Sequence, residues 1–435
     1  MLELITLGLF LAALTICLIS QLEILYALIF GLFCFNLYSF KQGYSLKNIF
    51  KMMLEGIITI KSILIIFIFI GLLTASWRAS GTIPYILYHG ISLIEPQIFA
   101  LCTFILCSAL SFLLGTSFGT VSTVGVICML LSNSAGLDPL LTGGAIISGI
   151  FFGDRGSPMS SSAQLVAVLT QTDVYNNTKL MFKSGAIPFL LTCLLYLFLS
   201  FGSKEININI SIANILADNL NLHWITLLPA ILVLVLTLLR IDVRIAMLAS
   251  ILLCCIIAVT YQNMSVTDLL NCLFYGYEAK DNPALAQLLN GGGLLSMLQV
   301  MLIVTISASY SGVFFHTKLL ANIKNFIKKL AKPIRPFGAT LTTATLTCAI
   351  ACNQTLAIIT TKQLSQDLYK DKTEHALALE NTVVLIAVLI PWNIAASVPL
   401  ATINAPVETI CYAFFLYLVP LYNWLIAFLQ PKEKK

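Results

Sequence analysis

Long apolar stretches, many of them about as long as a bilayer is thick, constrain this chain more than any other feature. Between Glu95 and Asp138 the sequence contains no acid, lysine, arginine or histidine. Crossing the hydrocarbon takes about 20 mostly apolar residues in a helix, and lipid leaves no backbone group unpaired outside helices or closed barrels. The runs are much longer than the alternating segments of about 10 residues that are typical of a barrel. We therefore predict an all-α, polytopic membrane protein.

Composition excludes several other classes of protein. Only 10% of the 435 residues are charged and 59% are hydrophobic, whereas a soluble domain has about 25% charged residues. The net charge of +5 does not indicate nucleic-acid binding, because no segment is long enough to form a basic domain in water. The cysteines lack metal-ligand spacing, and neither a Walker loop nor a nucleophile–base arrangement is present. We expect a protein embedded in the lipid bilayer that is not an enzyme and has no cofactor.

Several apolar runs are too interrupted to form one straight helix. The letters GTSFGT at 115–120 lie near the middle of the run 97–132, and glycines with short hydroxyls free the backbone at membrane depth. The run 336–361 is interrupted by CNQ at 352–354, and the run 382–407 by PWN at 391–393. Proline removes one helical hydrogen bond and blocks another. These patterns predict broken helices. The breaks are assigned to Gly115, Gly119, Gly153, Pro158, Pro391 and Trp392.

Basic loops predict the orientation. Lys41, Lys47 and Lys51 share a connection without an acid, and the stretch from Lys318 to Arg335 is equally basic. The positive-inside rule places these loops and the lysine-rich C-terminus in the cytoplasm, whereas the acidic connection 261–291 suits the outside. We expect an integral protein of the cell (inner) membrane with both termini cytoplasmic.

The two halves of the chain share one helix order with opposite orientation. Two spans, a loop and a third span open the first half over 3–77, and a matching set opens the second half over 222–315. Adding the same number of residues to positions 115 and 154 gives positions 354 and 393, so the polar breaks of the first half recur in the second half. Such inverted repeats are common among secondary transporters. We predict repeats over 1–202 and 222–435, joined by an external linker over 203–221.

The densest polar cluster is GDRGSPMSSSAQ at 153–164, with apolar runs on both sides. Gly153 and Pro158 prevent a continuous helix, so carbonyls, hydroxyls and the Asp154 carboxylate converge. Hard cations such as Na⁺ take oxygen ligands of this kind. Burial favours a protonated carboxyl and a bound cation favours the carboxylate, so H⁺ and Na⁺ would compete for Asp154. Alternatively, Asp154 and Arg155 lie solvated in an interfacial loop, although ionisable residues at membrane depth are usually functional.

The other candidate ligands each have a purely structural alternative. Thr116 and Ser117 can bind the ion or bond back to their own helix. Asn353 and Gln354 can bind it or join neighbouring helices. Asn393 can bind it or cap the helix beyond the proline break.

Two further residues lie near the breaks. Glu380 can be an interfacial acid without a role, an ion-pair partner for Arg155, or a second proton carrier. Trp392 abuts a break, where it can line the cavity.

Together these motifs resemble the NhaC-type Na⁺/H⁺ antiporter family of the ion transporter superfamily. GTSFGTVSTVG at 115–125 is similar to that family's glycine/threonine segment, and GDRGSPMS at 153–160 to its aspartate–serine–proline signature. The pairs at 353–354 and 379–380, then IPWN at 390–393, follow in family order. The resemblance implies an inverted-repeat transporter that exchanges Na⁺ for H⁺ or couples such ions to an organic anion. The chain departs from the family at Ser161 and Asn381, where many members have an acid, so ion specificity and stoichiometry stay open.

Our leading hypothesis is a Na⁺/H⁺ antiporter that works by alternating access, with Na⁺ and H⁺ competing at Asp154. A rival is a Na⁺- or H⁺-coupled transporter or exchanger of a small organic anion or amino acid, because the N-termini of half-helices attract anions. An ion channel shares broken helices and hydroxyl-lined paths. Assembly into a homo-oligomer is left open. The predicted ion-binding residues are Asp154, Ser157, Ser160, Thr116, Ser117, Asn353, Gln354 and Asn393.

Overall fold

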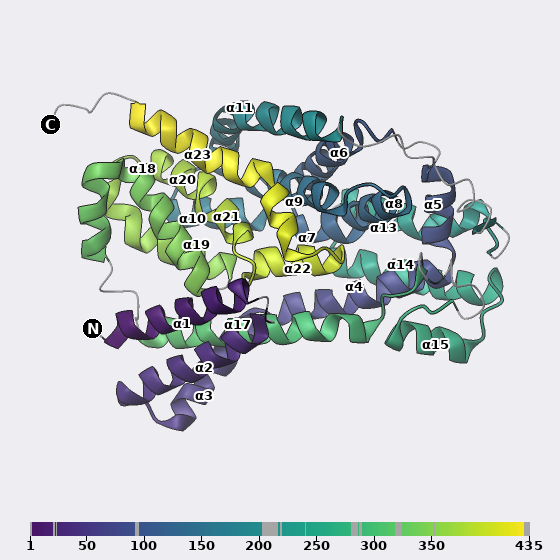
Figure 1. Cartoon of the computed structure of the whole chain (residues 1–435), viewed down its shortest axis with the longest axis horizontal. Coiled ribbons are helices and arrows are strands. Elements are labelled where there is room, and N and C mark those ends of the chain that lie inside the picture. The colour runs from purple at the N-terminus through teal and green to yellow at the C-terminus, as the bar shows by residue number, and fades with distance from the viewer. Residues whose placement is uncertain are drawn as a thin grey trace.

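The computed structural model describes residues 2–20, 22, 24–91, 95–201, 216–217, 220–239, 241–279, 286, 289–317, 324–351 and 353–429. Apart from one isolated bridge between Tyr277 and Gly291, the regular structure in these ranges is helical. Figure 1 shows an elongated bundle in which many helices run along the long axis. The prediction of an all-α fold is confirmed.

Helices occupy most of both halves of the chain. The first half contains α1 (Leu2–Ile19), α2 (Ile24–Lys41), α3 (Leu46–Thr59), α4 (Lys61–Ala79), α5 (Thr82–Ile91), α6 (Phe99–Leu114), α7 (Ser117–Thr120), the π-helix η1 (Val121–Gly125), α8 (Val126–Ser134), α9 (Pro139–Gly156), α10 (Ser161–Thr170) and α11 (Val174–Ser200). The second half contains η2 (Trp224–Leu227), α13 (Leu228–Leu238), α14 (Val243–Thr260), α15 (Val266–Tyr275), η3 (Leu294–Met297), α17 (Leu298–Thr317), α18 (Lys324–Ala351), α19 (Gln354–Ser365), η5 (Gln366–Leu368), α20 (Lys372–Asn381), α21 (Val383–Ile386), η6 (Ala387–Leu389), α22 (Ile394–Thr402), η7 (Val407–Tyr412) and α23 (Phe414–Leu429).

Polar breaks interrupt the runs in which the sequence predicts them, but two of the glycines assigned to breaks, Gly119 and Gly153, lie inside α7 and α9. α6 ends at Gly115, whose φ of 65° is the left-handed conformation that glycine adopts most easily. α7 begins after Thr116, whose side chain accepts a hydrogen bond from the Gly119 backbone N–H at 3.3 Å. α19 begins after Asn353, which accepts bonds from two backbone N–H groups of that helix. The first turn of each of these two helices is therefore capped by the side chain of the residue that precedes it.

The remaining two breaks have the same design. α10 begins after Ser160, whose hydroxyl accepts a bond from the Ser162 backbone N–H at 3.2 Å. The helical segments 372–389 and 394–402 meet at a bend of 55°, and Asn393 caps the second segment. Each half thus contains two breaks at which a polar side chain caps the helix that follows. The breaks recur in both halves, but one constant shift does not superpose them residue by residue.

Two large apolar cores divide the bundle. The first includes Phe104, Phe151 and Phe415 and joins α6 and α9 to helices of the second half. The second includes Phe67 and Trp77 and lies around α4, α13 and α14. In Figure 1 the helices α18 to α23 lie with α9 to α11 in the upper part of the view, and α1 to α4 lie with α14, α15 and α17 below them. The breaks between α9 and α10 and between α18 and α19 lie against the first core.

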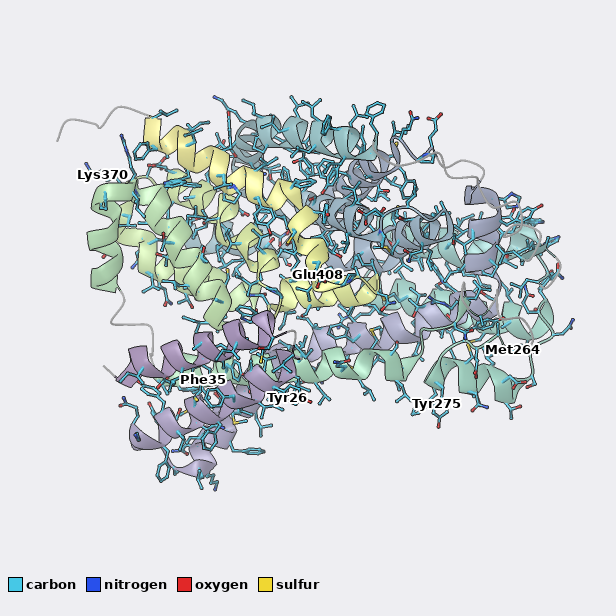
Figure 2. All side chains as sticks on the ribbon, in the orientation of Figure 1. Tyr26, Phe35, Met264, Tyr275, Lys370 and Glu408 are labelled. Atoms are coloured by element: carbon cyan, nitrogen blue, oxygen red, sulfur yellow. The ribbon has the colours of Figure 1, made fainter. Side chains whose placement is uncertain are left out.

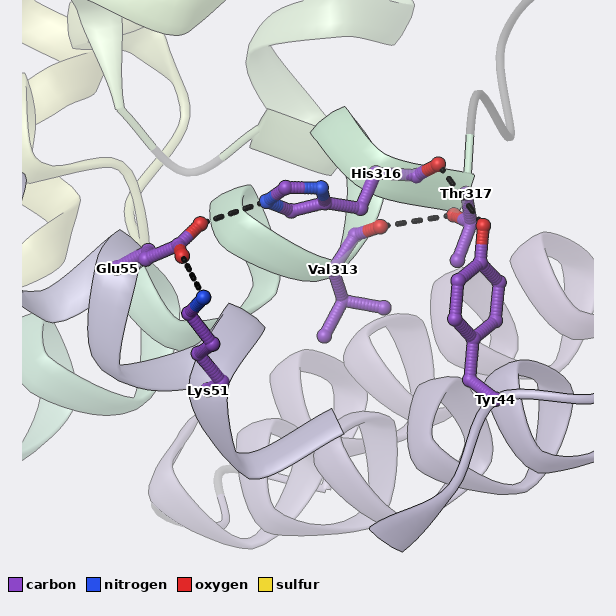
Figure 3. Close-up of polar contacts among 6 residues, drawn as sticks. All are labelled: Tyr44, Lys51, Glu55, Val313, His316 and Thr317. Atoms are coloured by element: carbon purple, nitrogen blue, oxygen red, sulfur yellow. Dashed lines mark hydrogen bonds and ion pairs between the residues drawn. The ribbon is translucent and has the colours of Figure 1, made fainter. Parts of the chain in front are cut away.

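α3 and α17 cross closely at two glycines. A Cβ on Gly56 would lie 2.9 Å from the backbone nitrogen of Gly312, so a larger residue would push the helices apart. Beyond this crossing, His316 Nε2 lies 2.7 Å from Glu55 Oε2, and Lys51 Nζ lies 4.0 Å from Glu55 Oε1 (Figure 3). These contacts hold α3 against the end of α17.

Large apolar side chains cover the outer helices. Figure 2 shows side chains, Tyr275 among them, projecting from the bundle, and Tyr275 is 68% exposed. In the part of the chain that the structure describes, Ser117–Ser134 and Val174–Ser200 are each long and apolar enough to cross a membrane, and two bent helix pairs qualify together. Shorter apolar helices of 10–17 residues accompany them. These features are those of a polytopic helical membrane protein.

The third span that the sequence predicts within residues 3–77, the apolar run 54–77, is not one straight helix in the structure. Two helices cover this run, and the segments Leu46–Thr59 and Ile63–Ala79 meet at a bend of 51°. The structure also adds a non-helical residue at Thr382, with φ of −122° and ψ of −84°, which separates α20 from α21. Most of the predicted linker 203–221, Met1, the loop 318–323 and the C-terminal residues 430–435 lie outside the described residues.

Candidate functional site

The Asp154 carboxylate is held by side chains from both halves of the chain. Asp154 lies in the last turn of α9 and is only 4% exposed. Ser160 Oγ donates to Asp154 Oδ1 at 3.0 Å, and Gln354 Nε2 approaches Asp154 Oδ2 at 3.5 Å. Ser162 Oγ donates to the Asp154 backbone carbonyl at 2.9 Å. The carboxylate therefore joins the break after α9 to the first residue of α19.

The residues between α9 and α10 explain why the backbone opens beside this carboxylate. The Ser157 backbone N–H donates to Gly153 O at 2.8 Å and ends the helix, and Ser157 Oγ accepts from the Met159 backbone N–H at 3.2 Å. Pro158 has no N–H to continue the helix. Gly115 of the first break packs against this loop, because a Cβ there would lie 2.6 Å from the Met159 carbonyl carbon. The first two breaks therefore touch.

The second half supplies the opposite wall. Gln354 Nε2 also donates to Val384 O at 2.9 Å, which ties α19 to α21. Asn393 is fully buried, and its Nδ2 donates to Cys348 O at 3.0 Å near the end of α18. Trp392 Nε1 donates to Ala349 O at 2.8 Å. Thus the break around Pro391 is bonded to the end of the helix that precedes the Asn353 break.

Arg155 and Glu380 lie next to this arrangement as a second buried pair. Arg155 Nε donates to Asn381 Oδ1 at 3.1 Å, and Arg155 Nη2 donates to Met181 O and to Ser184 Oγ at 2.9 Å each. Neither oxygen of Glu380 has a hydrogen-bond partner among the residues that the structure describes. Arg155 attracts Glu380 electrostatically, and Asp154 repels it. The predicted direct ion pair is not among the contacts of the described residues.

Comparison with known proteins identifies the family. A family model described as the Na⁺/H⁺ antiporter family matches residues 2–163 and 149–429. The chain belongs to this family. The predicted resemblance is confirmed.

Antiporters whose names give different cargoes are similar to this chain over most of its length. The malate-2H(+)/Na(+)-lactate antiporter of Bacillus subtilis is 30% identical over 89% of this chain and 86% of that relative. The Na(+)/H(+) antiporter NhaC of Alkalihalophilus pseudofirmus is 27% identical over 87% and 84%. The arginine/ornithine antiporter ArcD of Halobacterium salinarum is 25% identical over 86% and 80%. Family membership makes the chain a secondary transporter of the membrane.

In this antiporter-family protein, some of the predicted ligands contact the Asp154 carboxylate and others do not. Ser160 and Gln354 contact Asp154 directly. The hydroxyl of Thr116 and the amides of Asn353 and Asn393 cap their own helices. The remaining two predicted ligands, Ser117 and Ser157, are buried without a hydrogen bond to the Asp154 carboxylate.

Three contacts of the site were not predicted from the sequence. Ser162 lies in the serine run that the sequence marks as polar, so its contact with Asp154 could have been predicted. The bonds from Arg155 to Asn381 and Ser184 join positions 226 and 29 residues apart. No local pattern signals such contacts.

Proposed function

We propose that this protein is a Na⁺/H⁺ antiporter that works by alternating access, with Na⁺ and H⁺ excluding each other at the Asp154 site. The observation that carries the proposal is a buried carboxylate bonded by Ser160 and Gln354, one from each half of the chain, beside unwound backbone. We place the protein in the inner membrane with both termini in the cytoplasm, following its basic loops.

The oxygen chemistry of the site suits a small hard cation. Ser160 Oγ, which donates to Asp154, can turn its hydroxyl hydrogen away and offer a lone pair to Na⁺. The amide oxygen of Gln354 can turn in the same way, and carbonyls near Pro158 are free of helical bonding. One carboxylate with neutral oxygens balances one monovalent cation. A proton on the same carboxylate would remove both its charge and one acceptor.

We propose that residues 1–202 and 222–435 form inverted repeats joined through 203–221. The recurrence of two capped breaks in each half supports this division. Figure 1 adds that α18 and α19 lie toward one end of the long axis and α8 lies toward the other. Two oppositely directed halves that meet at one carboxylate form the arrangement from which alternating access follows.

A direct test compares two aspartates of α9. Proteoliposomes with an inward proton gradient receive Na⁺, and a trapped dye reports internal pH. Asp154→Asn should abolish Na⁺-dependent pH recovery. Asp138→Asn should keep it, because Asp138 is an exposed N-cap whose Oδ1 accepts from the Leu140 backbone N–H at 2.9 Å, and asparagine caps equally well. Full exchange in Asp154→Asn would refute the proposed site.

A second candidate is exchange of a small organic anion or amino acid coupled to Na⁺ or H⁺. The name of the relative from Bacillus subtilis, at 30% identity, combines Na⁺ and protons with two carboxylates. The capped N-termini of α19 and α22 also present partial positive charge to an anion. A panel of carboxylates and amino acids tested for a shift in melting temperature separates the candidates, because a pure ion exchanger should respond to Na⁺ alone.

A further inference from the structure

Glu380 is a buried acid to which the exchange at Asp154 gives no role. It lies in the last turn of α20 and is 0% exposed. In the described part of the chain, both of its carboxylate oxygens lack a hydrogen-bond partner. A buried carboxylate without donors is strongly disfavoured as an anion, so it holds a proton or depends on a compensating charge.

Arg155 is the compensating charge, but its Nε and Nη2 donors are bonded elsewhere. Asn381 Oδ1 accepts from Nε, while Met181 O and Ser184 Oγ accept from Nη2. Asn381 is an amide, so it satisfies donors without neutralising the guanidinium. The positive charge therefore acts through space on Glu380, and the Asp154 carboxylate acts on Glu380 with the opposite sign.

Within the described residues, Asp154, Arg155 and Glu380 are the buried side chains among the aspartates, glutamates, lysines and arginines. No further buried side chain of these types therefore adds a charge to this group. The helices packed against α20 are α10, α11, α18, α19, α21 and α23. Of these, α10, α21 and α23 carry no charged residue or histidine. The other described charged groups and the histidine on these helices and on α20 are exposed or bonded elsewhere: Lys179, Lys183, Arg335, Lys362, Lys372, Glu374 and His375.

We propose that Glu380 carries the proton that Na⁺ displaces, and that Arg155 couples the two carboxyls through charge. Without Na⁺, the Asp154 carboxylate balances Arg155, and Glu380 is neutral. When Na⁺ joins Asp154, a second positive charge enters the buried group, and the Glu380 O–H bond breaks to release H⁺ to water on the open side. Both states have zero net charge, so one Na⁺ exchanges for one H⁺.

The hydrogen bonds decide which carboxyl holds the proton. Asp154 accepts from Ser160 and Gln354, and these donors favour its anion. Glu380 accepts from no group of the described ranges, which favours its neutral form. Because the carboxyls interact, they titrate as a pair that holds one extra positive charge, either H⁺ or Na⁺. This inference rests on the proposed Na⁺/H⁺ exchange and moves the proton from Asp154 to Glu380, so that Na⁺ at Asp154 and H⁺ at Glu380 exclude each other through charge.

The test counts protons released on Na⁺ binding. Purified protein in weakly buffered detergent is titrated with NaCl, a pH dye reports released H⁺, and calorimetry reports bound Na⁺. The wild type should release about one H⁺ per Na⁺ bound. Glu380→Gln should bind Na⁺ more weakly and release no proton. Glu380→Asp should restore release, and Glu374→Gln should match the wild type, since Glu374 is an exposed acid on the same helix.

Several outcomes would overturn the inference. Release of one H⁺ per Na⁺ by Glu380→Gln would place the proton on Asp154. Na⁺ binding without release in the wild type would also contradict it. If Glu380→Gln does not fold, wild-type proteoliposomes decide, because one-for-one exchange should not respond to an imposed membrane potential, and a marked response refutes the charge balance. An absence of any Na⁺/H⁺ exchange in the wild type would instead refute the proposed function.

Discussion

Replacing Gln354 with leucine removes the side chain through which the second half of the chain reaches Asp154. Gln354 Nε2 donates to Val384 O at 2.9 Å, and the loss of such a bond to a buried carbonyl costs about 1 kcal/mol. The contact with Asp154 Oδ2, at 3.5 Å, lies at the long limit of a hydrogen bond and adds about 0.5–1 kcal/mol. We expect the free energy of unfolding to fall by about 1–2 kcal/mol. Loss of an oxygen near the ion should raise the half-saturating Na⁺ concentration roughly fivefold, which corresponds to about 1 kcal/mol.

Two assays check this prediction. Thermal melts of purified protein with and without Na⁺ measure stability, and the Na⁺ dependence of exchange in proteoliposomes measures the ion site. Gln164→Leu is the matched control, because the Gln164 amide also lies at the break after α9 but is exposed and donates to Pro158 O at 3.1 Å. If Gln354→Leu keeps both the wild-type melting temperature and the wild-type Na⁺ dependence, the bridge between the halves has no energetic role.

Three further predictions address the surrounding structure. Ser160→Ala removes both the cap of α10 and a donor to Asp154, so melts should show about 1 kcal/mol lower stability and exchange should need more Na⁺; unchanged values in both assays would contradict this role. Gly153→Val places side-chain atoms against the backbone of α6 and should aggregate on size-exclusion chromatography, whereas Gly8→Ala should stay monodisperse, since no atom lies within 4 Å of its added Cβ. The guanidinium of Arg244 holds the pKa of the Asp242 carboxyl below its usual range. This pair therefore stabilises the fold above about pH 4 and stops doing so as pH falls through the lowered pKa, so acid melts of Asp242→Asn should lose that part of the pH dependence.

The sequence indicated where the helices break but not how the broken ends are bonded. Glycine at 115, the proline–serine run after Asp154 and the proline at 391 are local signals, because these residues change the backbone wherever they occur. The bend at Ile60 and the interruption at Thr382 lack such a signal, since no glycine or proline lies within two residues of either position. The link between Arg155 and Asn381 spans 226 residues. Only the packing of α9 against the second half makes that link, so no periodicity in the sequence could reveal it.

The four caps at Thr116, Ser160, Asn353 and Asn393 have a practical consequence for the isolated protein. Each is uncharged and completes the first turn of its own half-helix before any ion arrives. The helical bundle therefore does not need a bound ion to stay folded. Protein extracted into sodium-free detergent should be intact and able to bind the ion. A rise in melting temperature on adding sodium chloride then reports ion binding at the site, provided that potassium chloride at equal ionic strength produces no comparable rise.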